Sequence, residues 1–417
     1  MNAARPLSFR VIQDALRKTT EYLAGELTAP TEAPPRWNEF EWAVARSAIA
    51  MQGIAVLLAN RLRWRGPADW QTFLEEQRHH GRLRHERIGE LLERIDSAAR
   101  SAGVPVVALK GAALRSFNFY APGERPMGDI DLLVAPAALG AVSTLLRSIG
   151  YVEAFTTARH AVFDPRDKLA TVGYGEHVNN ALKIEVHTLI AEALPVRVVD
   201  ITADLTQAGR PGINPYACDA ALMRHLLLHA AGNMRAHALR QIPLHDIALL
   251  AAGLRPADWD QLLRVSSPGE TPWWMLPPLA LTDRYYPRQI PQTVLARLGP
   301  HCPRALRFAV QRQSLTTVSW SNLRIHAFPG IAWSQSAREA LEFIKRRVLP
   351  SQRALRELEF ATVAMPRLQQ VPWYNESHLR RIVRWVTSRP PRVQTMVSVT
   401  AALAASDTGF GQRAAGR

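Results

Sequence analysis

The sequence predicts a mixed α/β domain flanked on both sides by helical regions. Three observations support this fold class. Hydrophobic side chains in the first hundred residues recur at the three- and four-residue spacing of amphipathic helices. Short β-branched runs then alternate with helical segments between residues 103 and 205. After Pro215 the helical spacing returns and continues to about residue 387.

The first region, residues 1–102, is predicted to be helical. We expect one helix from Trp37 to Arg63, capped by Asn38, because no proline interrupts this hydrophobic stretch. A second helix is expected from Ala68 to Ala102, where Gly103 provides the stop that commonly follows a helix.

The central region, residues 103–205, is predicted to be the α/β domain. Its expected helices are Ala112–Tyr120 and Pro136–Ser148, the second of which begins with proline and is followed by Gly150. The expected strands are Val104–Leu109, Asp129–Val134, Tyr151–Phe155, Ala161–Phe163, Leu169–Tyr174 and Ala181–Leu189.

The remainder is predicted to form a second helical region, residues 206–387, divided by prolines. Residues 388–417 begin with a pair of prolines and end in small and polar residues, which indicates a flexible tail.

The composition is that of a folded globular protein. The chain has 417 residues, of which 47% are hydrophobic and 21% charged, so wholesale disorder is excluded and two or three domains are expected. Cys218 and Cys302 are too few for a disulfide framework or a cysteine-based zinc site, which favours a cytoplasmic location. No hydrophobic stretch reaches the length of a transmembrane segment.

The chain is basic. It has 51 Lys and Arg against 36 Asp and Glu, a formal net charge of +15, which favours weak binding to polyanions. The segments Lys345–Arg347 and Arg380–Trp385 could contact RNA or an anionic membrane, although the interpretation that we favour is that they are solvated helix faces.

Three acids are the candidate catalytic and metal-binding residues. Asp129 and Asp131 are two residues apart in a predicted strand, so both side chains project to the same side. Glu185 lies in a later hydrophobic strand and joins them if the two strands are neighbours. Mg²⁺ prefers such oxygen ligands, and two ions held this way can promote in-line phosphoryl or nucleotidyl transfer.

Residues near these acids are candidates for binding phosphate. Lys110 and Gly111 form the turn after the first predicted strand, where backbone N–H groups and a lysine charge can hold phosphate. Arg125 and Gly128 lie in the loop before Asp129. His187 is two residues after Glu185 and is expected either to orient that acid or to contact substrate.

The segment LKGAALRSFNFYAPGERPMGDIDLLV, residues 109–134, and the later run IEVH, residues 184–187, resemble one known family. This is the uncharacterised nucleotidyltransferase family of the DNA polymerase β-like nucleotidyltransferase superfamily. The resemblance implies a mixed sheet with flanking helices and a transfer of NMP from an NTP to a hydroxyl, using two Mg²⁺ ions or Mn²⁺. By motif, Asp129 and Asp131 would hold both ions and Glu185 the ion that activates the acceptor.

The turn departs from the wider superfamily, which usually has Gly-Ser where this chain has Lys110-Gly111-Ala112-Ala113.

The sequence identifies neither the donor base, with ATP one candidate, nor the acceptor, which is a small molecule, a peptide or protein side chain, or RNA. A non-catalytic scaffold that binds RNA or membranes stays open. A second alternative is a metal-dependent phosphohydrolase built on His225, His229, His245 and Asp246.

Overall fold

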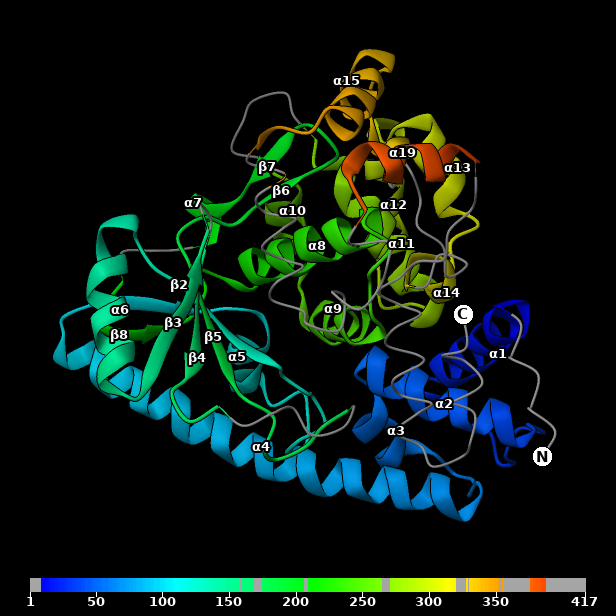
Figure 1. Ribbon diagram of the computed structural model, residues 1–417, viewed down its shortest axis with the longest axis horizontal. Coiled ribbons are helices and arrows are strands. Elements are labelled where there is room, and N and C mark those ends of the chain that lie inside the picture. Colours follow the sequence, from blue (N-terminus) through cyan, green and yellow to red (C-terminus); the bar gives the residue numbers. More distant parts are fainter. Residues whose placement is uncertain are drawn as a thin grey trace.

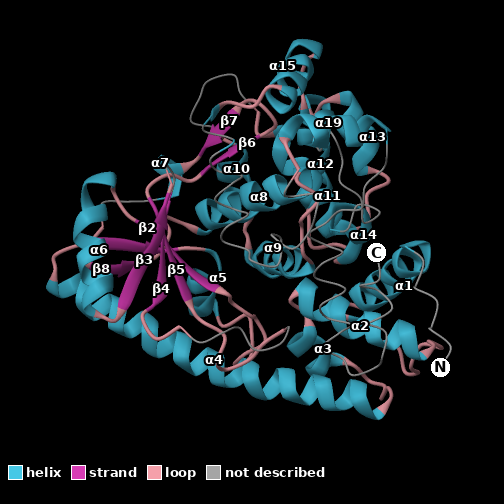
Figure 2. Ribbon diagram, in the orientation of Figure 1, coloured by secondary structure: helices cyan, strands magenta, loops and turns pink. Residues whose placement is uncertain are grey.

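A mixed six-stranded sheet forms the centre of the protein (Figures 1 and 2). The computed structural model describes residues 9–157, 160–168, 175–205, 209–264, 271–319, 328, 330–352, 355 and 376–387. The strands of this sheet are β1 (Pro105–Ala108), β2 (Asp129–Leu133), β3 (Tyr151–Thr156), β4 (His160–Pro165), β5 (Lys183–His187) and β8 (Gly212–Asn214). A separate hairpin contains β6 (Ala191–Ala193) and β7 (Val198–Asp200).

The strand order is β3-β4-β5-β2-β1-β8. β2 runs parallel to β5 and antiparallel to β1, while β1 runs parallel to β8. β4 runs antiparallel to both of its neighbours, β3 and β5. The predicted mixed sheet with flanking helices is therefore confirmed.

Two helices cover one face of the sheet. They are α4 (Ala68–Ser101) and α6 (Leu139–Ser148), and they bury the side chains of Ile130, Leu132, Ile184 and Val186. Because side chains alternate along a strand, the residues between these positions project to the opposite face. Short segments connect the strands: α5 (Lys110–Leu114), η1 (Arg115–Phe117), η2 (Pro136–Ala138) and α7 (Thr202–Leu205).

The opposite face packs against α8 (Asp219–Arg235), whose Met223 and Leu227 share a core with Leu133 of the sheet. α8 begins the C-terminal helical part of the molecule. Its other described helices are α9 (Gln241–Gly253), α10 (Pro256–Leu263), η3 (Trp273–Met275), α11 (Leu276–Tyr285), α12 (Gln292–Leu298), η4 (Gly299–His301), α13 (Arg304–Val310), α14 (Leu315–Ser319), η6 (Ile331–Trp333), α15 (Ala337–Val348) and α19 (His378–Thr387).

The N-terminal helices are α1 (Phe9–Glu26), α2 (Glu39–Gln52) and α3 (Ala55–Arg61). Figure 1 shows α4 running from beneath the sheet to these helices. At about 1.5 Å per residue, its 34 residues span about 51 Å. Glu21 of α1 accepts hydrogen bonds from Tyr285 Oη at 2.6 Å and from the backbone N–H of Thr316 at 2.8 Å. The N-terminal helices are thus joined directly to the C-terminal helical part of the molecule.

The predicted helix from Trp37 to Arg63 is wrong in one respect, because it is divided into α2 and α3. Gly53 ends α2 in the left-handed conformation, with a φ of 72°, which glycine adopts without steric cost. The predicted cap is confirmed: the Asn38 side chain accepts a hydrogen bond from the Glu41 backbone N–H, and the Glu41 carboxylate accepts one from the Asn38 backbone N–H.

Other predicted boundaries also move. The helix expected at Ala112–Tyr120 begins earlier and is shorter, as α5 and η1. β8 joins the sheet although it lies after residue 205, where the predicted α/β domain ends. The strand expected at Leu169–Tyr174 and the tail expected at 388–417 lie outside the described residues.

No described helix is by itself long and apolar enough to cross a membrane. The pair α2 and α3 meets that test only when taken together, and the chain bends by 113° between them.

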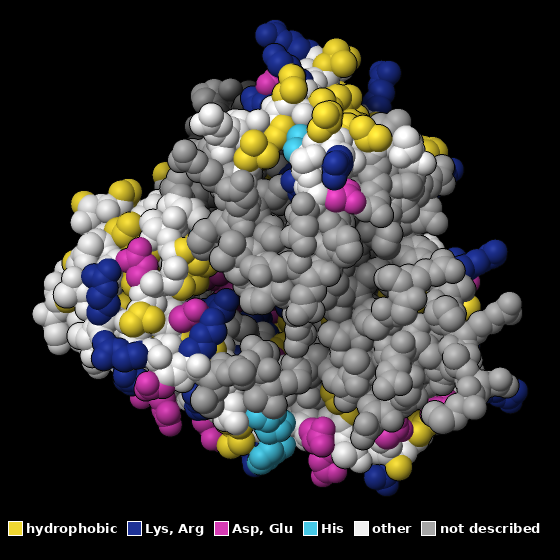
Figure 3. Space-filling view, viewed as in Figure 1, with side chains coloured by type: hydrophobic (Ala, Val, Ile, Leu, Met, Phe, Trp, Pro, Cys, Tyr) yellow, Lys and Arg dark blue, Asp and Glu magenta, His cyan; other side chains and the backbone are white. Residues whose placement is uncertain are grey.

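The basic C-terminal segments lie on α15 and α19, away from the sheet (Figure 1). Hydrophobic side chains and Lys or Arg side chains gather at this end of the surface (Figure 3), where Leu341, Leu349 and Leu379 are exposed. The side chains of Arg384 and Trp385 lie outside the described part of the chain. Binding of RNA or membranes here stays a prediction.

Three histidines in α8 and α9 are shielded from solvent: His225 and His245 are buried, and His229 is partly buried. Burial lowers the pKa of His229 to about 3 and that of His245 to about 4, and it holds the pKa of His225 well below its usual range. These rings are therefore neutral in the folded protein at pH 7.

The buried histidines predict a loss of stability in mild acid. Below about pH 6.5 the unfolded chain binds protons that the folded chain does not, so the free energy of unfolding falls with pH. His229 alone should contribute about 1–2 kcal/mol of this loss between pH 7 and pH 5. Urea unfolding at both pH values should show a smaller loss for His229→Gln than for the wild type.

His301→Gln is the matched control, because His301 is exposed, and it should keep the wild-type loss. An equal pH dependence in His229→Gln and the wild type would contradict the assignment of this loss to the buried ring.

Candidate active site

The two strands that carry the acids lie side by side. β2 pairs with β5 in a register that sets Asp131 beside Glu185 and Asp129 beside Lys183. Paired positions in neighbouring strands project to the same face. Asp129, Asp131 and Glu185 therefore share the face of the sheet opposite α4 and α6.

Asp131 is at the centre of the site and is 6% exposed. Its Oδ1 atom accepts hydrogen bonds from Lys110 Nζ at 3.1 Å and from His187 Nε2 at 2.9 Å. Burial acts to raise the pKa of Asp131, but the charge of Lys110 and the contact with His187 outweigh it and hold the pKa well below its usual range. Asp131 therefore carries a negative charge.

The other two acids hold their protons more strongly. Burial raises the pKa of Glu185, and the charges of Asp131 and Asp129 raise it further. Asp129 stands at the mouth of the site, where its surface is open to solvent. Desolvation by the surrounding protein nevertheless raises the pKa of Asp129, and the negative charge of Asp131 raises it further. The positive charges of Lys110 and Arg240 act to lower it.

Lys110 is the first residue of α5, two residues after the end of β1, and has a φ of 47°. This left-handed conformation is unfavourable for a non-glycine residue and is found most often at functional sites. Its backbone N–H donates to the Tyr216 hydroxyl at 3.1 Å, and that hydroxyl lies 2.7 Å from Nδ1 of His225. Burial acts to lower the pKa of Lys110, yet the neighbouring acids Asp131 and Asp129 raise it, so the ammonium stays charged.

His187 follows Glu185 by two residues and faces the same side. Its Nε2 atom lies 2.9 Å from Asp131 and 3.7 Å from Oε2 of Glu185. The ring also packs beside that of His160 on β4, with a centroid distance of 5.3 Å. Asp131, Glu185 and His187 each offer a metal-ligand atom, and these atoms lie within 4.8 Å of one another.

Gly111, the residue after Lys110, lies against the Arg125 side chain. The Arg125 guanidinium lies where a side chain at Gly111 would begin. It is bound by Asp246 of α9 through two hydrogen bonds of 2.8 and 2.7 Å, and Tyr120 donates to the same carboxylate at 2.6 Å. Arg125 therefore braces its loop against α9 through Asp246.

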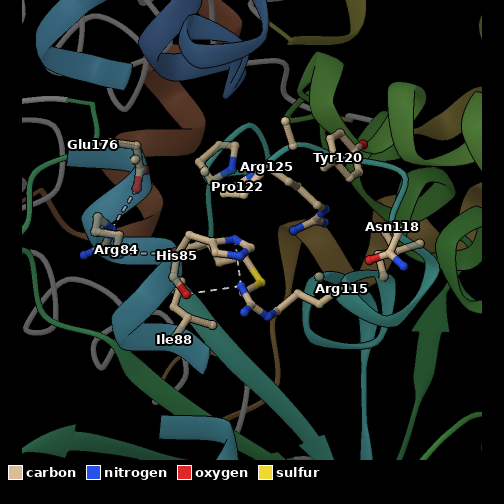
Figure 4. A pocket seen from close by; sticks show the side chains of 16 residues that line it. Arg84, His85, Ile88, Arg115, Asn118, Tyr120, Pro122, Arg125 and Glu176 are labelled. Carbon is tan, nitrogen blue, oxygen red and sulfur yellow. Dashed lines mark hydrogen bonds and ion pairs between the residues drawn. The ribbon is translucent and has the colours of Figure 1, made fainter. Parts of the chain in front are cut away.

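A cavity of about 270 Å³ lies between α4 and the segment from Gly111 to Met127 (Figure 4). Arginines from both sides line it. Arg84 pairs with Glu176 at 2.7 Å, and Nη1 of Arg115 lies 2.8 Å from Nδ1 of His85. Lys110 lines a different cavity, of about 230 Å³, together with His160, His187, Glu192 and His229.

Gly128 and Arg240 complete the neighbourhood of Asp129. Gly128 is exposed, and a side chain added there would meet open space. Arg240 precedes α9, and its charge acts on Asp129, Glu176 and Asp246. No spacing or motif marks Arg240 as part of the site, because only the packing of α9 brings it near β2.

The side chains of the alternative phosphohydrolase site have other partners. Asp246 is bound by Arg125 and Tyr120, while the His245 ring packs against Tyr120 and Tyr286 with centroid distances of 5.6 and 5.3 Å. Among the described residues, the ligand atoms of His229, His245 and Asp246 do not converge.

Gly111→Ala should destabilise the protein, because its Cβ would overlap Nη1 of Arg125 and lie 2.5 Å from Sδ of Met127. Moving the guanidinium would also leave the buried Asp246 without its cation, so a loss of about 1–3 kcal/mol is expected in urea unfolding. The control is Gly128→Ala, for which a change below about 0.5 kcal/mol is expected. Equal stabilities of the two variants would contradict the contact between Gly111 and Arg125.

Comparison with known proteins gives one match. The model of a family described as uncharacterised nucleotidyltransferase matches residues 38–270, which contain β1, β2, β5 and α9. No curated protein and no solved structure matches the chain. Because the family match spans more than half of the 417 residues, the chain belongs to the uncharacterised nucleotidyltransferase family.

Proposed function

We propose that the protein transfers NMP from an NTP to a hydroxyl group of an acceptor, with release of pyrophosphate. The observation that carries this proposal is the pairing of Asp131 with Glu185 across two parallel strands, with Asp129 at the mouth of the same face. Membership of a nucleotidyltransferase family agrees with it.

The triphosphate would bind where positive charge faces Asp129. Lys110, Arg240 and Arg125 are the cations whose charges act on that carboxylate. The Gly-Ser hydroxyl of the wider superfamily is missing from the turn, so Lys110 and the backbone N–H groups after it would take its place. Arg125 would act at longer range, because Asp246 binds its guanidinium.

Asp129, Asp131 and Glu185 would hold two divalent metal ions, Mg²⁺ or Mn²⁺. The donor set fits hard cations, since Asp131 carries its charge and the Asp131 and Glu185 side chains share one face. When bound, the ions would neutralise the charge of the reacting phosphate and orient it for in-line attack.

In the reaction, the acceptor oxygen forms a bond to the α-phosphorus while the bond from this phosphorus to the pyrophosphate oxygen breaks. The hydroxyl proton would move to Glu185, because its raised pKa makes it the better proton acceptor beside the ionised Asp131. Lys110 would hold Asp131 in place throughout, since its ammonium lies 3.1 Å from Oδ1.

The acceptor would occupy the cavity of about 230 Å³ that Lys110, His187 and His229 line. This volume is below the range of roughly 300–1,000 Å³ of sites for drug-sized ligands, so a small acceptor group fits it best. Both cysteines are free thiols, which is consistent with the cytoplasmic location that we propose.

Asp129→Asn should reduce Mg²⁺-dependent pyrophosphate release at least 100-fold, because the amide removes a metal-binding charge. The fold should persist, since Asp129 is exposed. The measurement is pyrophosphate release from each of the four NTPs, with cell extract as the source of acceptor.

Glu153→Gln is the matched control, because Glu153 is an exposed carboxylate on β3 of the same sheet, and it should keep the wild-type rate. A wild-type rate in Asp129→Asn would refute the catalytic role of Asp129.

A further inference from the structure

The ligand atoms that converge most closely in the site include an imidazole nitrogen. The group consists of Asp131, Glu185 and His187, while Asp129 stands apart from it. Within the described parts of the chain, no other group of three His, Cys, Asp or Glu side chains brings its ligand atoms so close together.

The distances suit a single metal ion. His187 Nε2 lies 2.9 Å from Asp131 Oδ1 and 3.7 Å from Glu185 Oε2. Neighbouring ligands of an octahedral ion with bonds of about 2.1 Å are about 3 Å apart. One ion could therefore contact all three side chains after small side-chain movements.

The backbone fixes this arrangement. Glu185 and His187 are two residues apart in β5, and Asp131 is paired with Glu185 in β2. The His187 side chain is only 13% exposed and packs beside the ring of His160. A ring held in this way loses little conformational entropy when it binds a metal.

The chemistry of the three donors distinguishes between metals. Mg²⁺ prefers oxygen ligands and gives up its water reluctantly, whereas imidazole suits first-row transition ions. Mn²⁺ binds carboxylate oxygens as Mg²⁺ does, and as a first-row transition ion it also accepts an imidazole ligand. Two carboxylates and one imidazole thus favour Mn²⁺ over Mg²⁺.

We infer that His187 is a metal ligand together with Asp131 and Glu185, and that this position selects Mn²⁺ over Mg²⁺. The inference rests on the proposed function, because it assigns the metal of the same site. A second ion, held by Asp129 and the phosphates of the NTP, would have only oxygen ligands and would be Mg²⁺. In the metal-free protein, the N–H group at Nε2 of His187 donates a hydrogen bond to Asp131. This nitrogen must lose its proton to bind a metal, because it cannot hold both at once.

The test is binding of Mn²⁺ and Mg²⁺ to the full chain without nucleotide, measured by calorimetry and by electron paramagnetic resonance of Mn²⁺. The wild type should bind Mn²⁺ at least tenfold more tightly than Mg²⁺. Pulsed electron paramagnetic resonance of the wild type should detect coupling of the bound Mn²⁺ to a ¹⁴N nucleus. His187→Gln should lose that coupling and weaken Mn²⁺ binding about 10–100-fold, with Mg²⁺ binding changed less than threefold.

His79→Gln is the control for adventitious binding to surface histidines, because His79 is exposed on α4, and it should bind Mn²⁺ as the wild type does. Mn²⁺ bound without ¹⁴N coupling, or bound equally well by His187→Gln, would overturn the role of His187. The absence of Mn²⁺ binding to the wild type would also overturn it. Mg²⁺-dependent pyrophosphate release that needs Asp129 would still support the proposed function in each of these cases.

Discussion

The parallel register between β2 and β5 is the constraint on which the site depends. It sets Asp131 beside Glu185, and the same register buries Ile130, Leu132, Ile184 and Val186 on the opposite face. A shift of one residue in either strand would turn its acid into the core and its hydrophobic side chains toward the site. The hydrophobic packing of α4 and α6 therefore fixes the position of the carboxylates without contacting them.

Three carboxylates so close together repel one another, and the fold offsets this repulsion with cations from separate elements. Lys110 comes from the turn after β1, Arg125 from the loop before β2, and Arg240 from the start of α9. Asp246 in turn holds Arg125 in place through two hydrogen bonds. The burial of α9 is thus connected to the charge of the site, and α9 lies within the matched family segment, residues 38–270.

Local patterns in the sequence predicted the elements of the site, but not their full set of partners. Strand alternation predicted that Asp129 and Asp131 share a face, and the hydrophobic run around Glu185 predicted its strand. The contact of Arg125 with Asp246 spans 121 residues and leaves no periodic signal. Short strands such as β8, three residues long, were also missed because three residues are too few to show alternation. The break at Gly53 was underestimated because the hydrophobic spacing continues through it.

In the proposed reaction, Lys110 after β1 would take the place of the serine hydroxyl that the wider superfamily usually has. A serine hydroxyl is a neutral donor, whereas the Lys110 ammonium adds a full positive charge beside Asp131. Its left-handed backbone is supported by the hydrogen bond from Lys110 N–H to the Tyr216 hydroxyl, which belongs to the segment before α8. Under the proposed function, the charge of Lys110 would replace the directed hydrogen bond of the serine. Because the Lys110 ammonium is already bound to Asp131, it would be shared between this carboxylate and a phosphate, and one side chain would couple binding of the NTP to the carboxylate proposed to hold metal.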